Sequence, residues 1–283
     1  MTTHFKTQGV ALAALLTLAS VHSAQAARLQ LVSAGTAVDV LTQSTSFEGT
    51  TSSRSITGNL QDGSGAGTVL LSDFQAFGPA TQGLISVEDG YSHLVSVDAS
   101  GASTSLTLDA SHYWTGSEPV GIFAGVLSEY TLTQSLSLDG LSLQVVADAG
   151  ETLGQAVTVS FSGLAQALLT GAAQNNNLGL TLDVLLGNTT VGSYQGLWTG
   201  DATEAVNLSF SAVVGDTFSV LVSGYQDASD GSRLIQFPGT YEFSGGVSLQ
   251  GNFAVTAVPE PESWGLALAG LLIAGVAARR RRA

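Results

Sequence analysis

Apolar and polar residues alternate with period two over much of the chain. Runs of this kind occupy residues 106–110, 157–161, 178–184, 206–212 and 218–222. Such alternation is typical of strands that have one face in a core and the other face in water. Glycine, asparagine and aspartate punctuate the runs, and no long helical pattern interrupts them. The sequence therefore predicts an all-β domain, and many short strands favour a β-sandwich of jelly-roll or immunoglobulin-like type.

Two Gly-Asp or Asp-Gly pairs predict where this chain turns. Asp139-Gly140 lies between two alternating arms in residues 135–145, which predicts a hairpin with a type I′ turn. Gly215-Asp216 predicts a second hairpin between the strands around Phe210 and Val220. Residues 163–174 are open to two interpretations, a short helix or a strand and loop. Residues 247–255 predict a final strand that leads into the C-terminal tail without a long linker.

The N-terminus has the three parts of a secretory signal peptide. Lys6 precedes an apolar stretch at residues 10–21, and Ala24-Gln25-Ala26 forms an A-x-A cleavage site. We expect signal peptidase to remove residues 1–26. Residues 27–257, between this peptide and the C-terminal tail, are then expected to form an all-β extracellular domain. The alternative is an uncleaved N-terminal anchor.

The C-terminus, residues 258–283, also has three parts. Pro259-Glu260-Pro261 precedes an apolar run at 264–278, and Arg279-Arg280-Arg281-Arg282 follows the run. As a helix the run would span roughly 24 Å, at about 1.5 Å per residue, against about 30 Å for a bilayer core. Snorkelling arginines and an interfacial Trp264 can close that gap. An arginine cluster stays on the cytoplasmic side as a membrane stop, so the upstream chain is expected outside.

These three elements resemble the PEP-CTERM sorting signal of Gram-negative bacteria. The resemblance covers about a tenth of the chain and rests on Pro259-Glu260-Pro261, the 264–278 helix and Arg279 to Arg282. It implies recognition and processing by exosortase, an integral-membrane transpeptidase-like enzyme. It also implies an exported protein with an inner-membrane intermediate and a final place at the cell surface or outside the cell. A plain C-terminal membrane anchor is the alternative, but it leaves the Pro-Glu-Pro motif unexplained.

Composition narrows the partners of the predicted domain. Residues 27–257 contain three arginines, no lysine and 20 acidic residues, a formal charge of −17. This charge argues against nucleic acid and anionic lipid as ligands, because both require positive charge. The chain has no cysteine, so stability has to come from core burial, with metal or partner binding as possible additions.

Candidate catalytic residues are few. His93 and His112 are the histidines that remain after the signal peptide, and no G-x-S-x-G motif positions a serine nucleophile. Both histidines are interpreted as strand residues, with His112 at a strand end. Glu88-Asp89 could supply the carboxylate pair of a glycoside hydrolase, but Gly90 follows them and favours a turn. No catalytic residue is therefore predicted, and an extracellular hydrolase is kept as an alternative.

Calcium is the one cofactor that the acidic composition suggests. Residues 227–232 place Asp227 and Asp230 among serines in a predicted loop, and carboxylate oxygens suit Ca²⁺. Residues 62–65 are a lesser candidate. Neither segment has the full EF-hand pattern, and turn chemistry alone explains the same residues.

Sugar binding is the other candidate activity. Tyr113-Trp114 and Trp198, the latter near Tyr194, lie in predicted loops beside polar residues, and aromatic faces pack against the apolar faces of sugars. The alternative is that these rings cap the ends of the core. The resemblance of the tail to the PEP-CTERM signal implies a non-enzymatic, exported surface or extracellular-matrix protein, structural or associated with exopolysaccharide. A carbohydrate-binding module is the second hypothesis.

Overall fold

The computed structural model describes residues 27–33, 35–47, 50–59, 68–82, 85–100, 103–117, 126–148, 152–171, 175–235, 240–258 and Gly270. Several predicted features lie outside these residues: the signal peptide with Ala24 and Ala26, the 62–65 segment, Pro259 to Pro261, the 264–278 helix and Arg279 to Arg282. Within the described ranges, no helix is long and apolar enough to cross a membrane.

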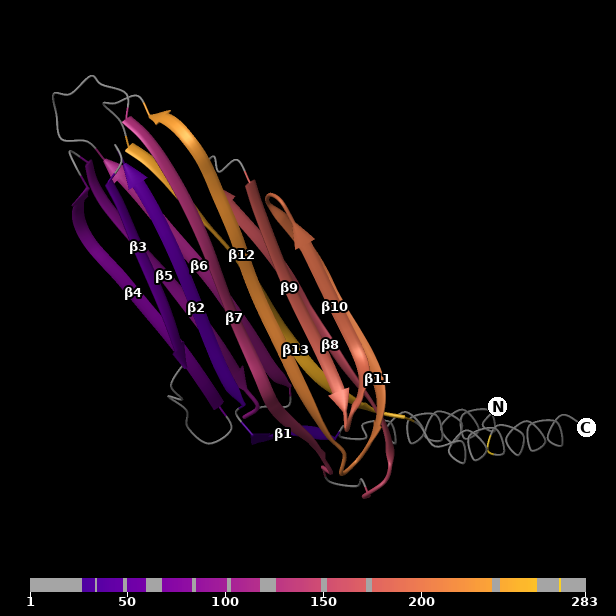
Figure 1. The fold of residues 1–283 in the computed structure, drawn as a ribbon. Helices are drawn as coiled ribbons and strands as arrows, with labels where there is room; N and C mark the ends of the chain where they lie inside the picture. The colour runs from indigo at the N-terminus through magenta and orange to yellow at the C-terminus, as the bar shows by residue number, and fades with distance from the viewer. Residues whose placement is uncertain are drawn as a thin grey trace, which may run out of the picture.

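Two antiparallel sheets contain all the strands of the described chain (Figure 1). Sheet A has the order β10-β9-β12-β7-β2-β3, with β1 beside β7. Its strands are β1 (Arg28–Ser33), β2 (Thr36–Phe47), β3 (Thr50–Asn59), β7 (Val126–Val146), β9 (Asn175–Leu186), β10 (Thr189–Trp198) and β12 (Thr217–Ile235). Sheet B has the order β11-β8-β13-β6-β5-β4. Its strands are β4 (Thr68–Gln82), β5 (Ile85–Asp98), β6 (Thr104–Ser117), β8 (Ala156–Thr170), β11 (Ala202–Val213) and β13 (Thr240–Ala257).

The apolar faces of the two sheets pack against each other, as the alternation predicts. Phe218 of β12 lies 5.8 Å from Phe253 of β13 between ring centroids, and Phe253 lies 4.7 Å from Phe161 of β8. All three rings are buried. This aromatic contact joins sheet A to sheet B, which is the arrangement of a β-sandwich. The all-β prediction is confirmed, while jelly-roll or immunoglobulin-like topology stays a prediction.

The predicted strands are present with the predicted faces inward. The apolar residues of all five alternating runs are buried or half-buried, and the residues between them are exposed or half-buried, except Gly179, which is buried. Of the two interpretations of residues 163–174, a short helix or a strand and loop, the structure shows a strand as far as Thr170, where β8 ends. The final strand is also confirmed, as β13, and it lies between β8 and β6 with pairing on both sides.

The predicted hairpin at Asp139-Gly140 is wrong. β7 runs through this pair as one strand of 21 residues. Against β12, the register shifts so that Leu221 alone lies opposite both Asp139 and Gly140, which is a β-bulge. Gly140 has the positive φ of 77° that the Asp-Gly signal predicted. A hairpin and a bulge both keep Leu138 and Leu141 on the same face, so the alternation did not distinguish them.

The predicted hairpin at Gly215-Asp216 is also wrong, because the chain there passes from one sheet to the other. β11 belongs to sheet B and β12 to sheet A. Backbone hydrogen bonds attach this crossing to β7: Gly215 N–H donates to Val145 at 2.8 Å, and Val145 N–H donates to Asp216 at 2.9 Å. The glycine supplies a φ of 106°, so the turn residues were identified correctly but not their partners.

The β7 bulge generates a stability prediction at Gly35, which joins β1 to β2 with a φ of 73°. A Cβ at Gly35 would come within 2.5 Å of the Asp139 carbonyl oxygen and 2.6 Å of the Leu141 nitrogen. Gly35→Ala should therefore cost more than the about 1–2 kcal/mol of the left-handed conformation alone. Gly187→Ala is the matched control, since Gly187 also has a positive φ but open space around it. Equal losses in urea unfolding would show that the bulge tolerates a methyl group.

Candidate functional site

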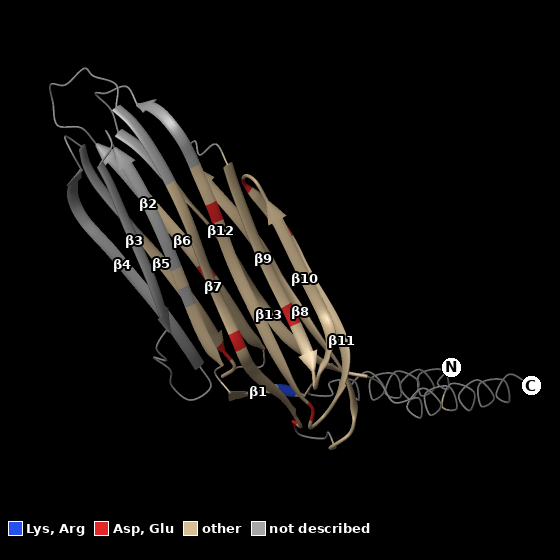
Figure 2. Cartoon of the chain, viewed as in Figure 1, with Lys and Arg blue, Asp and Glu red and all other residues tan. Residues whose placement is uncertain are grey.

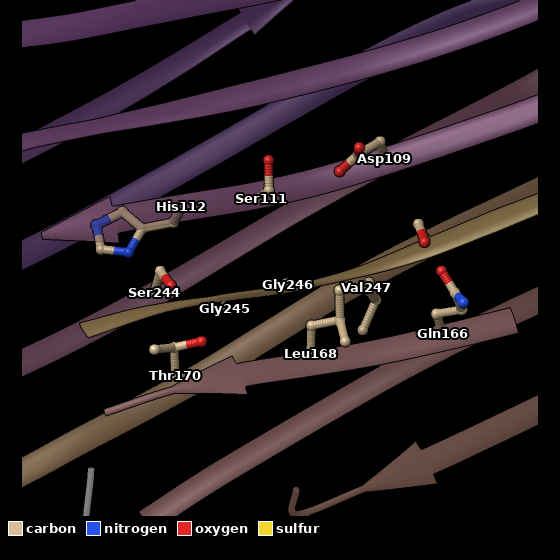
Figure 3. Close-up of a pocket in the computed structure, with 11 residues that line it drawn as sticks. Asp109, Ser111, His112, Gln166, Leu168, Thr170, Ser244, Gly245, Gly246 and Val247 are labelled. Carbon is tan, nitrogen blue, oxygen red and sulfur yellow. The ribbon is translucent and has the colours of Figure 1, made fainter. Parts of the chain in front are cut away.

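A hollow lies on the outer face of sheet B. It encloses about 250 Å³ above Gly246. Figure 3 shows Asp109 and Ser111 on β6 at one side, and Gln166, Leu168 and Thr170 on β8 at the other. These side chains alternate with buried core residues such as Ala110 and Ala167, so they belong to the solvent face. We call this depression the Gly246 hollow.

Two adjacent glycines of β13 make room on both faces of the sheet. A Cβ at Gly245 would lie 2.8 Å from Nε2 of Gln226, so this glycine admits the Gln226 side chain between the sheets. A Cβ at Gly246 would clash with the carbonyl oxygen of Ala110. Without a side chain at Gly246, the centre of the outer face stays open between β6 and β8.

The polar groups of the hollow include one carboxylate. Burial raises the pKa of Asp109, while a hydrogen bond from Ser111 and the field of His93 lower it in part. Ser111 Oγ also lies 3.3 Å from the Ser92 carbonyl oxygen. Gln166, Thr170 and Ser248 add neutral donors and acceptors. The site can therefore hydrogen-bond a polyhydroxylated ligand through several groups.

A cluster of polar side chains lies behind the hollow, between the sheets. Gln134 of β7 donates from Nε2 to Oε1 of Gln226 at 2.8 Å, and its own Oε1 lies 3.5 Å from Nε2 of His93. His93, Gln134 and Gln226 are fully buried, and His112 is 3 % exposed. Gln226 Nε2 has no hydrogen-bond partner in the described chain. This interior cluster joins β5, β7 and β12 across an otherwise apolar core.

His112 is held neutral in this cluster. Burial lowers its pKa from 6.5 to about 3, and the field of His93 adds to the shift. Its register partner in β13 is Gly245, and the histidine is also one of the groups that line the hollow. His112 lies within β6 and not at a strand end, so that part of our interpretation is wrong.

Trp198 lies at an edge of the sandwich, where β10 of sheet A meets β11 of sheet B. Its Nε1 donates to Oε1 of Glu204 at 2.8 Å, and Tyr194 donates its hydroxyl to Oε2 at 2.9 Å. These two bonds lower the pKa of Glu204, while burial and the same carboxylate raise the pKa of Tyr194. Trp198 is 9 % exposed and belongs to the core cluster. Glu204 therefore holds the two aromatic rings across the seam between the sheets.

The three predicted glycan contacts do not form one site. Tyr113 and Trp114 lie in strand β6, and Tyr194 and Trp198 in strand β10, so the predicted loops are wrong. Tyr113 is half-buried and pairs in register with Ser244 beside the hollow. The side chain of Trp114 lies outside the described part.

The predicted calcium loop is also wrong, because Asp227 and Asp230 lie within strand β12. Asp227 pairs with Thr133 on one side and Asn177 on the other. Within the described chain, no three His, Cys, Asp or Glu residues lie together as a metal site would require. Glu88-Asp89 likewise lies in strand β5 and not in a turn. Figure 2 shows acidic residues as isolated positions along the described strands.

Sequence reasoning missed the residues of the hollow and of the interior cluster. Asp109 and Gln166 occupy outer positions of alternating runs, which pattern alone marks only as solvent-facing. Gln134 and Gln226 occupy inward positions, and that departure from apolar alternation was a detectable signal. The consecutive Gly245-Gly246 within a strand pattern was a second one, because such glycines mark close approach or open space.

Comparisons with known proteins identify the C-terminal tail but do not assign a function to the β domain. Residues 257–282 match the family model of the PEP-CTERM protein-sorting motif. No curated protein matches the chain. Among solved structures, a cyclase from Fischerella sp. TAU is 11 % identical over 66 % of this chain and 85 % of its own, with a TM-score of 0.24. The same enzyme with 4-(1H-indol-3-yl)butan-2-one has a TM-score of 0.22, at 12 % identity over 67 % of this chain and 90 % of its own. The VP2 protein of infectious bursal disease virus, as its D431N mutant, has a TM-score of 0.15, at 10 % identity over 84 % and 79 %. These scores carry no argument about function.

The described residues from 27 to 258 form an all-β domain of two antiparallel sheets. Its C-terminus carries the PEP-CTERM motif, which implies an exported protein that is sorted by the membrane enzyme exosortase.

The buried His112 generates a pH prediction. In the unfolded chain this histidine binds a proton below its ordinary pKa of 6.5. In the folded chain it stays neutral until the pH falls to about 3. As the pH is lowered through that window, the contribution of His112 to the free energy of unfolding therefore decreases by about 1.4 kcal/mol per pH unit. Between pH 6.5 and pH 5 the decrease is about 2 kcal/mol. Asp109 acts in the opposite direction. Its carboxyl pKa is raised in the fold, so the folded state binds a proton before the unfolded state does and becomes relatively more stable as the pH falls.

Urea unfolding at pH 7 and pH 5 measures this contribution as the difference between the wild type and His112→Gln. The variant should lose less stability than the wild type on acidification. The same pair of proteins in an Asp109→Asn background removes the opposing carboxyl. Equal pH dependence of the wild type and His112→Gln would contradict a neutral His112 in the fold.

Proposed function

We propose that this chain is a non-enzymatic component of the cell surface or extracellular matrix that associates with exopolysaccharide. The observation that carries the proposal is the direct junction between strand β13 and the sorting motif. β13 ends at Ala257, where the motif begins, and Val258 N–H still donates to Ala156 at 3.1 Å. The sorting machinery would thus handle a tail that leaves the middle of a packed sheet.

The described histidines support a non-enzymatic role. His93 and His112 are both buried between the sheets, and His112 is held neutral there. A general base has to reach the proton that it removes, and His93 is fully buried while only 3 % of His112 is exposed. The outer faces instead present short hydroxyl and amide side chains, such as Thr181 and Ser223, which lie 2.8 Å apart. Faces of this kind suit contact with a hydrated polysaccharide.

Replacement of Pro259, Glu260 and Pro261 by alanine tests the sorting step in the native host. The variant should keep its tail and stay in the inner membrane, because the motif is what exosortase is expected to read. Intact mass and cell fraction measure both effects. Glu262→Ala is the matched control, since it removes a neighbouring acid outside the Pro-Glu-Pro triplet. Unchanged mass and location of the triple variant would count against exosortase handling.

A host strain that makes no exopolysaccharide tests the matrix association separately. The processed protein should move from the washed matrix into the medium in that strain, because its binding partner is missing. Quantitative immunoblots of the matrix and medium fractions give the measurement. The same distribution in both strains would contradict the association while leaving the sorting step intact.

A further inference from the structure

We propose that the Gly246 hollow binds a single neutral sugar ring of a polysaccharide chain. This inference rests on the proposed association with exopolysaccharide and assigns it a place and a ligand class. The hollow lies on the outer face of β6, β13 and β8, and neither Tyr194 nor Trp198 is among its lining residues. It therefore differs from a site built on Trp198.

The lining groups match the chemistry of a sugar ring. Asp109 supplies an acceptor, Gln166 supplies two donors and an acceptor, and Thr170 and Ser248 act as both. Leu168, which is 59 % exposed, supplies an apolar surface at the rim. A pyranose has hydroxyls at its edge and C–H groups on its face, so it can use both kinds of contact.

The size of the hollow fits one ring. Sites for drug-sized molecules enclose about 300–1,000 Å³, and this hollow encloses about 250 Å³. It lies on the face of a sheet between neighbouring strands, so the rest of a chain can continue across the sheet. One ring would occupy the space above Gly246 while its neighbours lie on the flanking hydroxyl groups.

The charge of sheet B selects a neutral sugar. Its six strands contain no lysine or arginine, and Asp109 places a carboxylate at the hollow. A uronic acid would have to approach this carboxylate without a cation to offset the repulsion. A neutral hexose has no such cost, and one of its hydroxyls can donate a charge-assisted hydrogen bond to the Asp109 carboxylate.

Affinity gel electrophoresis of the full chain in detergent tests the site. The probes are laminarin and mannan as neutral polysaccharides, and polygalacturonate as the anionic one. The wild type should be retarded by at least one neutral polymer and not by polygalacturonate. Gln166→Ala and Asp109→Asn should each weaken the retardation about fivefold to tenfold, the loss expected for one hydrogen bond to a ligand.

Gln195→Ala is the matched control, because Gln195 is an exposed glutamine of β10 in sheet A. It should bind as the wild type does, within twofold. Asp109→Asn keeps the shape of the side chain and removes a half-buried charge, so its melting temperature should not fall. Weakened binding with an unchanged melting temperature would support the site directly.

Three results would overturn the inference. If both site variants bind like the wild type, the ligand lies elsewhere on the protein. Stronger retardation by polygalacturonate than by the neutral polymers would contradict the ligand class. If no neutral polymer binds while the exopolysaccharide-deficient strain still releases the protein, the association stands and this site is wrong. Failure of the association itself would appear in the strain comparison, which does not depend on the hollow.

Discussion

This fold depends on one constraint: every strand has to keep its apolar side chains on the face that lies in the core. A slip of one residue in a strand would turn its whole apolar set from the core to water. The strands here reach 21 residues, and the chain has no cysteine to cross-link them. The bulge at Asp139-Gly140 preserves the phase in β7, because it absorbs one extra residue and keeps Leu138 and Leu141 buried together. Gly35 packs against Gly140 at this bulge, so the connection between β1 and β2 lies directly against it.

The same alternation explains which parts of the fold were predictable. Burial is a local property of a strand, so residues such as Leu180 and Phe210 could be assigned to the core from pattern alone. Pairing is not local. The Asp139-Gly140 pair fits the backbone of a turn and of a bulge equally well. The bulge forms because β12 pairs with β7 on both sides of this pair. Gly215 likewise marks a turn without showing that the turn changes sheets.

The candidate site was harder to predict for a related reason. Asp109, Gln166 and Gly246 lie on three strands that are far apart in sequence, and sheet pairing alone makes them neighbours. The candidate binding residues that stood out in the sequence were aromatic or acidic, and the structure places Tyr113, Trp198 and Asp227 within strands. The indole of Trp198 is buried, and its N–H is bonded to Glu204.

Strand β13 connects the packing of the domain to the way it is displayed. Its Gly245 admits Gln226 to the core, its Gly246 opens the outer face, and its last residue begins the sorting motif. Ala257 follows Ser248 by nine positions, and a strand rises about 3.3 Å per residue, so the rim of the hollow at Ser248 lies about 30 Å along β13 from the start of the tail. That distance is comparable to the thickness of a bilayer core. The pairing of β13 with β8 and β6 lies within the domain, so removal of the tail would leave it unchanged.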